Sequence, residues 1–139
     1  GTVSPALCAG FGAAAMLAAQ RMAGDAAHVA HLWDIAVSEM AGWTINGLTT
    51  QRYRGNISLR REGVNATRLL SDARDVAFSL GSACGSGSGR VSHVLRAMGL
   101  TETQARSSIR LGWGRYTTAD DLRIGLGALK AAAAIQGIT

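Results

Sequence analysis

The sequence predicts a domain of the α+β class in which a small sheet is covered by helices on one face. Three observations lead to this prediction. The first forty residues are rich in alanine and carry one proline near their start, short β-prone segments begin after residue 42, and helix start signals then alternate with further strand segments. Helices followed by strands interleaved with helices are typical of an α+β layer.

A long helix is expected to begin at Pro5, because Ser4 suits the N-cap and proline suits the first helical position. Gly24 and Asp25 predict a break or kink between two helical stretches, which would pack antiparallel or end to end. Cys8 lies in the apolar part of this segment and is interpreted as a core residue.

The remaining elements follow from short-range signals. β-Prone runs between turn residues predict strands at 43–45, 56–59, 76–79 and 107–113. Helices are expected to begin after residues whose side chains can act as N-caps, namely Asn65, Ser92, Thr101 and Thr118. Gly99 is expected to end the second of these helices, and the last helix is expected to turn Leu122, Leu126 and Leu129 toward the core.

The predicted organisation is a helical segment over 1–42 and a small α+β domain over 43–139 that carries a Gly/Ser-rich loop at 81–91. With 139 residues, of which 47% are hydrophobic, the chain can bury a core without a disulfide or a metal. It lacks an initiator methionine and a signal-peptide pattern, so we interpret it as a mature, processed or excised piece.

Composition also excludes several classes of protein. The apolar stretch from Ala6 to Ala19 is shorter than a membrane span, so we expect no membrane insertion. The net charge is +5, but the arginines are dispersed and aromatic residues make up only 5%, so we expect no nucleic-acid binding. Two cysteines without a signal peptide favour a reducing compartment, and a cytoplasmic location is predicted.

Cys84 is the strongest candidate for a reactive residue. It lies in the loop, where Gly81, Gly85, Gly87 and Gly89 leave no bulky side chain to pack around the thiol. Most structural cysteines are buried and packed, whereas a thiol on a freely turning backbone suits a nucleophile that visits two partners in turn.

Arg110 is the candidate anion-binding residue. It lies within a predicted strand, where an unpaired cation is costly, and a guanidinium can bind a carboxylate through two hydrogen bonds. The alternative is an internal ion pair with Asp72 or Asp75. Arg115 is interpreted as structural.

The histidines give no metal site. His28 and His31 are three residues apart on one helix, but no second pair of ligands stands at a matching spacing, so a surface or helix-contact role is expected. His93 follows the cap Ser92 and either influences the nearby thiol loop or is a partly exposed first-turn residue. The motifs of phosphate-binding loops and serine hydrolases are absent from the sequence.

Several strings together resemble the cysteine desulfurase family, over essentially the whole chain. They are GT at 1–2, GFGAA at 10–14, SLGSACGSG at 79–87, SHVLRAMGL at 92–100, SSIRL at 107–111 and GRYTT at 114–118. The Ser-Ala-Cys loop is similar to that of the long-loop branch, the iron–sulfur-cluster and nitrogen-fixation type. Two departures are the Arg90-Val91 pair, where the family commonly has Glu-Pro, and a shorter tail after the last helix.

The resemblance implies the small C-terminal domain and connecting helices of an aspartate-aminotransferase-like (fold type I) enzyme that uses pyridoxal 5'-phosphate. Such enzymes convert L-cysteine to L-alanine and leave a persulfide on the loop cysteine, here Cys84. By the same resemblance, Arg110 would bind the substrate carboxylate. Thr2 would hydrogen-bond the cofactor phosphate of the neighbouring subunit in a dimer.

The family's lysine that forms the Schiff base lies in a segment that precedes the region matched here, and Lys130 does not correspond to it. The chain alone is therefore expected to be inactive and to work with a large-domain chain, passing sulfur to an acceptor or iron–sulfur scaffold protein. Two alternatives stay open, a non-catalytic sulfur-carrier or interaction module and a related selenocysteine or carbon–sulfur lyase.

Overall fold

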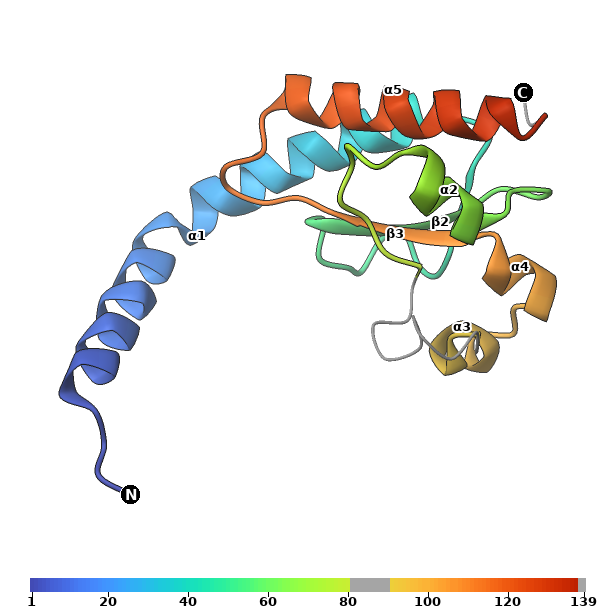
Figure 1. Ribbon diagram of the computed structural model, residues 1–139. Helices are drawn as coiled ribbons and strands as arrows, with labels where there is room; N and C mark the ends of the chain where they lie inside the picture. The colour runs from blue at the N-terminus through green and yellow to red at the C-terminus, as the bar shows by residue number, and fades with distance from the viewer. Residues whose placement is uncertain (81–90, 138–139) are drawn as a thin grey trace.

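The structure, a computed structural model, describes residues 1–80 and 91–137 and has the predicted α+β composition (Figure 1). Along the chain the elements are α1 (Pro5–Glu39), β1 (Thr44–Ile45), β2 (Asn56–Arg60), α2 (Ala66–Asp72), α3 (His93–Ala97), α4 (Glu102–Arg106), β3 (Ser108–Gly112) and α5 (Ala119–Ile135). Three of the four predicted strands and all the predicted helix starts are confirmed.

The three strands form one antiparallel sheet in the order β1-β2-β3. The strand predicted at 76–79 is wrong, because only Ser79 pairs with β3, through an isolated bridge to Arg110. The backbone N–H of Val76 still donates to the carbonyl of Ala73 at the end of α2, so the chain reaches extended geometry too late to form a longer ladder.

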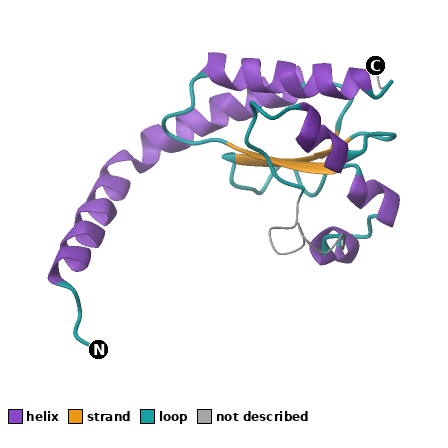
Figure 2. Ribbon diagram, in the orientation of Figure 1, coloured by secondary structure: helices purple, strands orange, loops and turns teal. Residues whose placement is uncertain are grey.

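The two faces of the sheet differ in character because side chains alternate along each strand. Ile57 and Leu59 of β2, with Ile109 and Leu111 of β3, are buried in the core. The helices α2 and α5 and the second half of α1 lie on one side of the sheet, while α3 and α4 lie beyond its other side (Figure 2). The polar residues of the strands, Arg110 among them, therefore share the face turned away from α5.

The first helix, α1, is continuous over 35 residues, so of the predicted break or kink near Gly24 the break is wrong, and the two stretches run end to end rather than antiparallel. Its axis changes direction between its two halves (Figure 1). A glycine inside a helix costs only about 1 kcal/mol, too little to end it here. Asp25 does not cap a new helix but pairs with Arg115.

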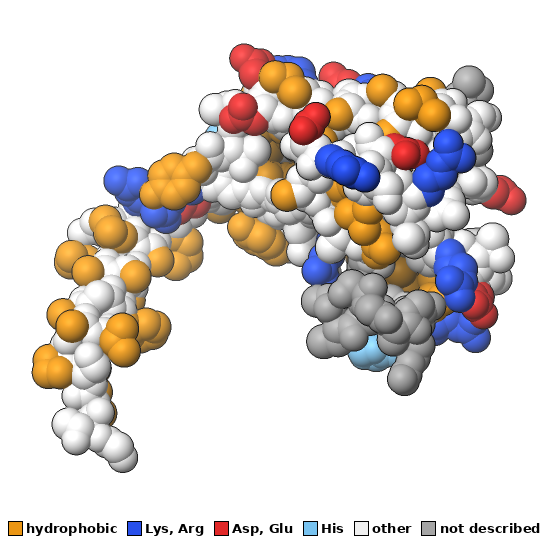
Figure 3. All heavy atoms as spheres, viewed as in Figure 1, with side chains coloured by type: hydrophobic (Ala, Val, Ile, Leu, Met, Phe, Trp, Pro, Cys, Tyr) orange, Lys and Arg blue, Asp and Glu red, His pale blue; other side chains and the backbone are white. Residues whose placement is uncertain are grey.

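The two halves of α1 have different surroundings. Residues 1–24 are all exposed, whereas the buried residues of the helix are Val29, Leu32, Trp33, Ile35 and Ala36. The prediction that Cys8 packs in the core is wrong: Cys8 is exposed, because in the described part of the chain no element covers the first half of α1. Figure 3 shows apolar side chains along this projecting half.

By length and composition alone, α1 is long and apolar enough to cross a membrane, which the sequence prediction had excluded. Its qualifying 18-residue window has a mean hydropathy of 1.2, and none of the window is buried. This is weak evidence for a membrane span, because an apolar helix at a protein–protein contact has the same properties.

The predicted helix caps are present. The side chains of Asn65, Ser92, Thr101 and Thr118 each accept a hydrogen bond from a backbone N–H in the first turn of their helices. Thr101 with Gln104 and Thr118 with Asp121 form complete capping boxes. Gly99 follows α3 with a φ of +87°, a left-handed conformation that favours glycine. Leu122, Leu126 and Leu129 are buried as predicted.

The second half of α1 is joined to the rest of the domain by side-chain contacts. His28 Nε2 lies 2.9 Å from the carbonyl oxygen of Thr117, which confirms the predicted helix-contact role of this histidine. Trp113 Nε1 donates to the carbonyl of Val29 at 3.3 Å, and the Trp113 ring lies 6.4 Å from that of Trp33. Lys130 forms an ion pair with Glu39 at 2.8 Å.

Candidate functional site

Arg110 lies in the middle of β3, on the sheet face turned away from α5, and its side chain is exposed. Its backbone is fixed on both sides. Arg110 pairs with Ser58 of β2, and on its other side it exchanges two backbone hydrogen bonds with Ser79, of 2.7 and 3.1 Å. The guanidinium is therefore presented by a rigid backbone, as a binding residue requires.

The alternative ion pairs of Arg110 are not found. Asp72 interacts with Arg68 at 3.3 Å, and no ion pair or side-chain hydrogen bond of Arg110 is present among the described residues. An exposed guanidinium without an internal carboxylate can bind an external one.

A polar network beside Arg110 was not found by sequence reasoning. Asn46 is only 4% exposed, and its amide nitrogen donates to Ser58 Oγ at 3.0 Å and to Ser108 Oγ at 3.1 Å. Its amide oxygen accepts from Arg60 Nη1. Strand alternation places Arg60 on the face of Ser58, but only the β2–β3 register shows that this is also the face of Arg110.

Cys84 lies outside the described residues, together with the rest of segment 81–90. The residues on either side of that segment are described. Ser79, which precedes it, is paired with Arg110, and Ser92, which follows it, is 5% exposed and caps α3. His93 is the first residue of α3 and is exposed.

Thr2 is not brought together with Arg110. It is exposed and precedes α1 at the end that projects away from the sheet (Figure 1). If Thr2 contacts a cofactor, that cofactor must therefore be bound by another polypeptide.

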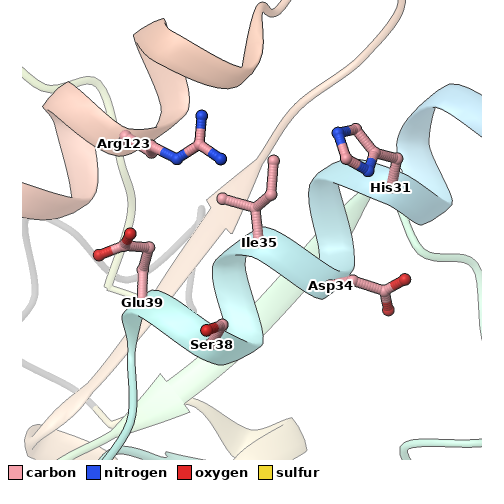
Figure 4. Close-up of a pocket in the computed structure, with 6 residues that line it drawn as sticks. All are labelled: His31, Asp34, Ile35, Ser38, Glu39 and Arg123. Atoms are coloured by element: carbon pink, nitrogen blue, oxygen red, sulfur yellow. The ribbon is translucent and has the colours of Figure 1, made fainter.

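A hollow lies between α1 and α5 (Figure 4). It is lined by His31, Asp34, Ile35, Ser38 and Glu39 of α1 and by Arg123 of α5. Its charged groups have partners elsewhere: Glu39 binds Lys130, and Arg123 interacts with Asp120 at 3.4 Å. The hollow is on the helical side of the sheet, away from Arg110, and no group of three or more possible metal ligands occurs among the described residues.

Comparison with known proteins gives a consistent result. The chain matches no family model. It is 40% identical over 126 residues to the cysteine desulfurase IscS of Rickettsia bellii, and 43% identical over 129 residues to a cysteine desulfurase of a Frankia species. Each match covers 88% of this chain and 31% of the relative.

Solved structures agree with the fold. A NifS-like protein from Rickettsia africae superimposes with a TM-score of 0.73 over 89% of this chain and 33% of that one, at 22% identity. Another NifS-like protein gives a TM-score of 0.70 at 20% identity. The predicted α+β fold, as found in part of these proteins, is confirmed.

Over 88% of its length the chain is similar to cysteine desulfurases, as its sequence motifs predicted, and it spans about a third of the length of the relatives it matches.

Proposed function

We propose that this chain is part of a cysteine desulfurase that transfers sulfur from L-cysteine to Cys84. The observation that supports this proposal most strongly is the 40–43% identity to cysteine desulfurases over 88% of the chain. In the overall reaction, L-cysteine and the Cys84 thiol give L-alanine and a Cys84 persulfide. The substrate C–S bond breaks, an S–S bond forms, and a hydrogen takes the place of sulfur on the substrate carbon. The persulfide then passes its terminal sulfur to an acceptor protein.

In this proposal Arg110 binds the substrate carboxylate. Its exposure, its fixed backbone and its lack of an internal carboxylate support that role. A bidentate guanidinium–carboxylate pair also fixes the orientation of the bound molecule, which would turn the substrate sulfur toward the cysteine that receives it.

The residues of this chain do not fit covalent attachment of pyridoxal phosphate. The sole lysine, Lys130, lies on α5 against the other face of the sheet from Arg110, and its ammonium is paired with Glu39. Within the proposed function, the lysine that holds it belongs to a polypeptide segment outside this chain, and Thr2 is the residue here that would contact its phosphate.

The exposed half of α1 supports a contact with that further segment. Leu7, Phe11, Met16 and Met22 in this half are each more than half exposed, with Phe11 at 79%, and so is Val3 just before the helix. Large apolar side chains gathered on one projecting helix are typical of a surface that another protein element covers. In the proposed enzyme, the two-thirds of the desulfurase fold that this chain does not span pack against this surface. Two such complete units form a dimer, and the proposed location is cytoplasmic.

The experiment is to purify the tagged chain from its natural source without denaturant and to identify the polypeptides and cofactor that are bound to it. We expect a companion polypeptide and visible absorption from a bound cofactor. After addition of L-cysteine, we expect Cys84 to gain the mass of one sulfur atom. Cys84→Ser should abolish the gain, whereas Cys8→Ser, which alters the other cysteine of the chain, should leave it intact.

Three results would contradict the proposal. Persulfide formation that survives Cys84→Ser would remove Cys84 from the reaction. A colourless chain that gains sulfur only from another persulfide-bearing protein would make it a sulfur carrier, and a preference for selenocysteine over L-cysteine would make it a different lyase.

A further inference from the structure

Arg60 is a second arginine on the sheet face that carries Arg110. Arg110 pairs with Ser58, and Arg60 stands two residues further along β2, opposite Ser108. The two arginines are therefore diagonal neighbours on one face, a separation of roughly 7–8 Å between backbone positions that long side chains easily bridge.

Neither arginine has a carboxylate partner. All nine acidic residues lie in the described part of the chain, and six of them form ion pairs elsewhere. A seventh, Asp121, accepts hydrogen bonds in the cap of α5. Glu62 and Asp75 are in no ion pair with Arg60 or Arg110. Two positive charges thus share one face without internal neutralisation.

The neighbouring polar groups leave donors available. Asn46 accepts from one nitrogen of Arg60, which orients that guanidinium and leaves its other N–H groups without an acceptor among the described residues. Ser108 Oγ accepts from Asn46 and donates to the carbonyl of Gln104 at 2.7 Å. Ser58 Oγ also accepts from Asn46, so its own proton remains to be donated elsewhere.

We propose that this face binds small molecules with two acidic groups, with Arg110 holding one group and Arg60 and the Ser58 hydroxyl holding the other. The inference rests on the proposed function, in which Arg110 binds the substrate carboxylate. It adds a second position for an acidic group, at Arg60, beside the position that holds the carboxylate. Two like charges repel each other, and a doubly charged ligand relieves that repulsion at both arginines.

The test compares succinate with butyrate, which have the same number of carbon atoms but two carboxylates and one. Binding to the 139-residue chain is followed at constant ionic strength by two-dimensional NMR, including the side-chain Nε–H signals of arginine. Succinate should bind about tenfold more tightly than butyrate and should shift the signals of both Arg60 and Arg110, since a charge-assisted hydrogen bond contributes on this scale.

Three variants sharpen the test. Arg60→Gln should reduce succinate affinity to that of butyrate, and Arg60→Lys, which keeps the charge, should retain part of the difference. Arg68→Gln is the matched control, because Arg68 is an exposed arginine on α2 that pairs with Asp72. It should leave both affinities unchanged, and backbone signals remote from the site report whether each variant is folded.

The outcomes separate this inference from the proposed function. Equal binding of succinate and butyrate, or an effect of Arg60→Gln no larger than that of Arg68→Gln, would overturn the role of Arg60. If Arg110→Gln still weakened both ligands in that case, Arg110 as a carboxylate-binding residue would stand. If Arg110→Gln changed neither affinity, the carboxylate role in the proposed function would fail instead.

Discussion

Arg115 donates from Nε to both carboxylate oxygens of Asp25, at 3.1 and 3.0 Å, across 90 residues of chain. Asp25 lies where α1 begins to pack against the domain, and Arg115 lies in the segment that leads into α5. The contact therefore joins these two parts of the chain. The hydrogen bond from Arg115 holds the pKa of Asp25 below its usual value, and Asp25 in turn raises the pKa of Arg115. The structural role predicted for Arg115 is confirmed.

This ion pair predicts an acid-sensitive part of the stability. Because the pKa of Asp25 is lowered in the folded state, its stabilisation is complete above the ordinary aspartate pKa of about 3.9 and is lost as the pH falls below it. Asp25→Asn should therefore lower the thermal midpoint modestly at neutral pH and should differ less from the natural chain near pH 3. A difference that grew on acidification would contradict this.

The last helix offers a matched pair of core and surface substitutions. Leu126 is 1% exposed and lies in the core, whereas Ile124 on the same helix is 73% exposed. Leu126→Ala should lower the free energy of unfolding by about 2–5 kcal/mol, and Ile124→Ala by less than about 0.5 kcal/mol, in denaturant titrations. Equal effects would mean that α5 does not pack on the sheet as described.

Two glycines should respond in opposite directions to alanine. Gly127 lies within α5 with nothing within 4 Å of the added methyl group, so Gly127→Ala should stabilise the chain by about 0.5–1 kcal/mol. Gly99 is equally open but has a φ of +87°, and Gly99→Ala should destabilise by about 1 kcal/mol. Thermal melts of the two variants check both signs, and stabilisation by Gly99→Ala would show that the left-handed turn is absent.

The projecting half of α1 should be needed for association with the proposed companion polypeptide. Phe11→Ser removes a ring that is 79% exposed, and should reduce the amount of companion recovered with the tagged chain from its source. Ile135→Ser removes a comparably exposed apolar side chain, at 70%, from the opposite end of the fold. It should leave recovery unchanged, and a similar loss for both variants would argue against a specific contact.

Arg110→Ala should act on substrate binding in the assembled enzyme. Loss of one bidentate carboxylate contact costs about 2 kcal/mol, or roughly thirtyfold in KM for L-cysteine, if the pair is made in the ground state and the transition state alike. Steady-state kinetics with Arg68→Ala as the control would measure this. An unchanged KM would refute the assignment of Arg110.

Short-range features of the fold were predictable from sequence, because they depend on residues three or four positions apart. The capping pairs Thr101–Gln104 and Thr118–Asp121 are of this kind, since each side chain bonds the backbone of its own first turn. The second strand was equally clear, because Ile57 and Leu59 alternate with polar residues.

Features that depend on distant residues were not predictable in the same way. The residue pattern at 76–79 resembled that of a strand, but the backbone N–H of Val76 donates to the carbonyl of Ala73 instead of to a neighbouring strand. The apolar surroundings of Cys8 in sequence suggested burial, although burial depends on whether another element covers the helix. The partnership of Arg60 with Arg110 required the register of two strands that are about fifty residues apart.

The different surroundings of the two halves of α1 have a consequence for its helix–coil equilibrium. Helix formation is limited by its first turn, and the packed turns around Leu32 and Trp33 supply that turn already formed. The helix can therefore extend from these packed turns into the exposed residues. The amide hydrogens of the exposed residues should exchange with solvent progressively faster toward Pro5. A partner that covers them then meets a helix already in place and loses less conformational entropy on binding than a disordered segment would.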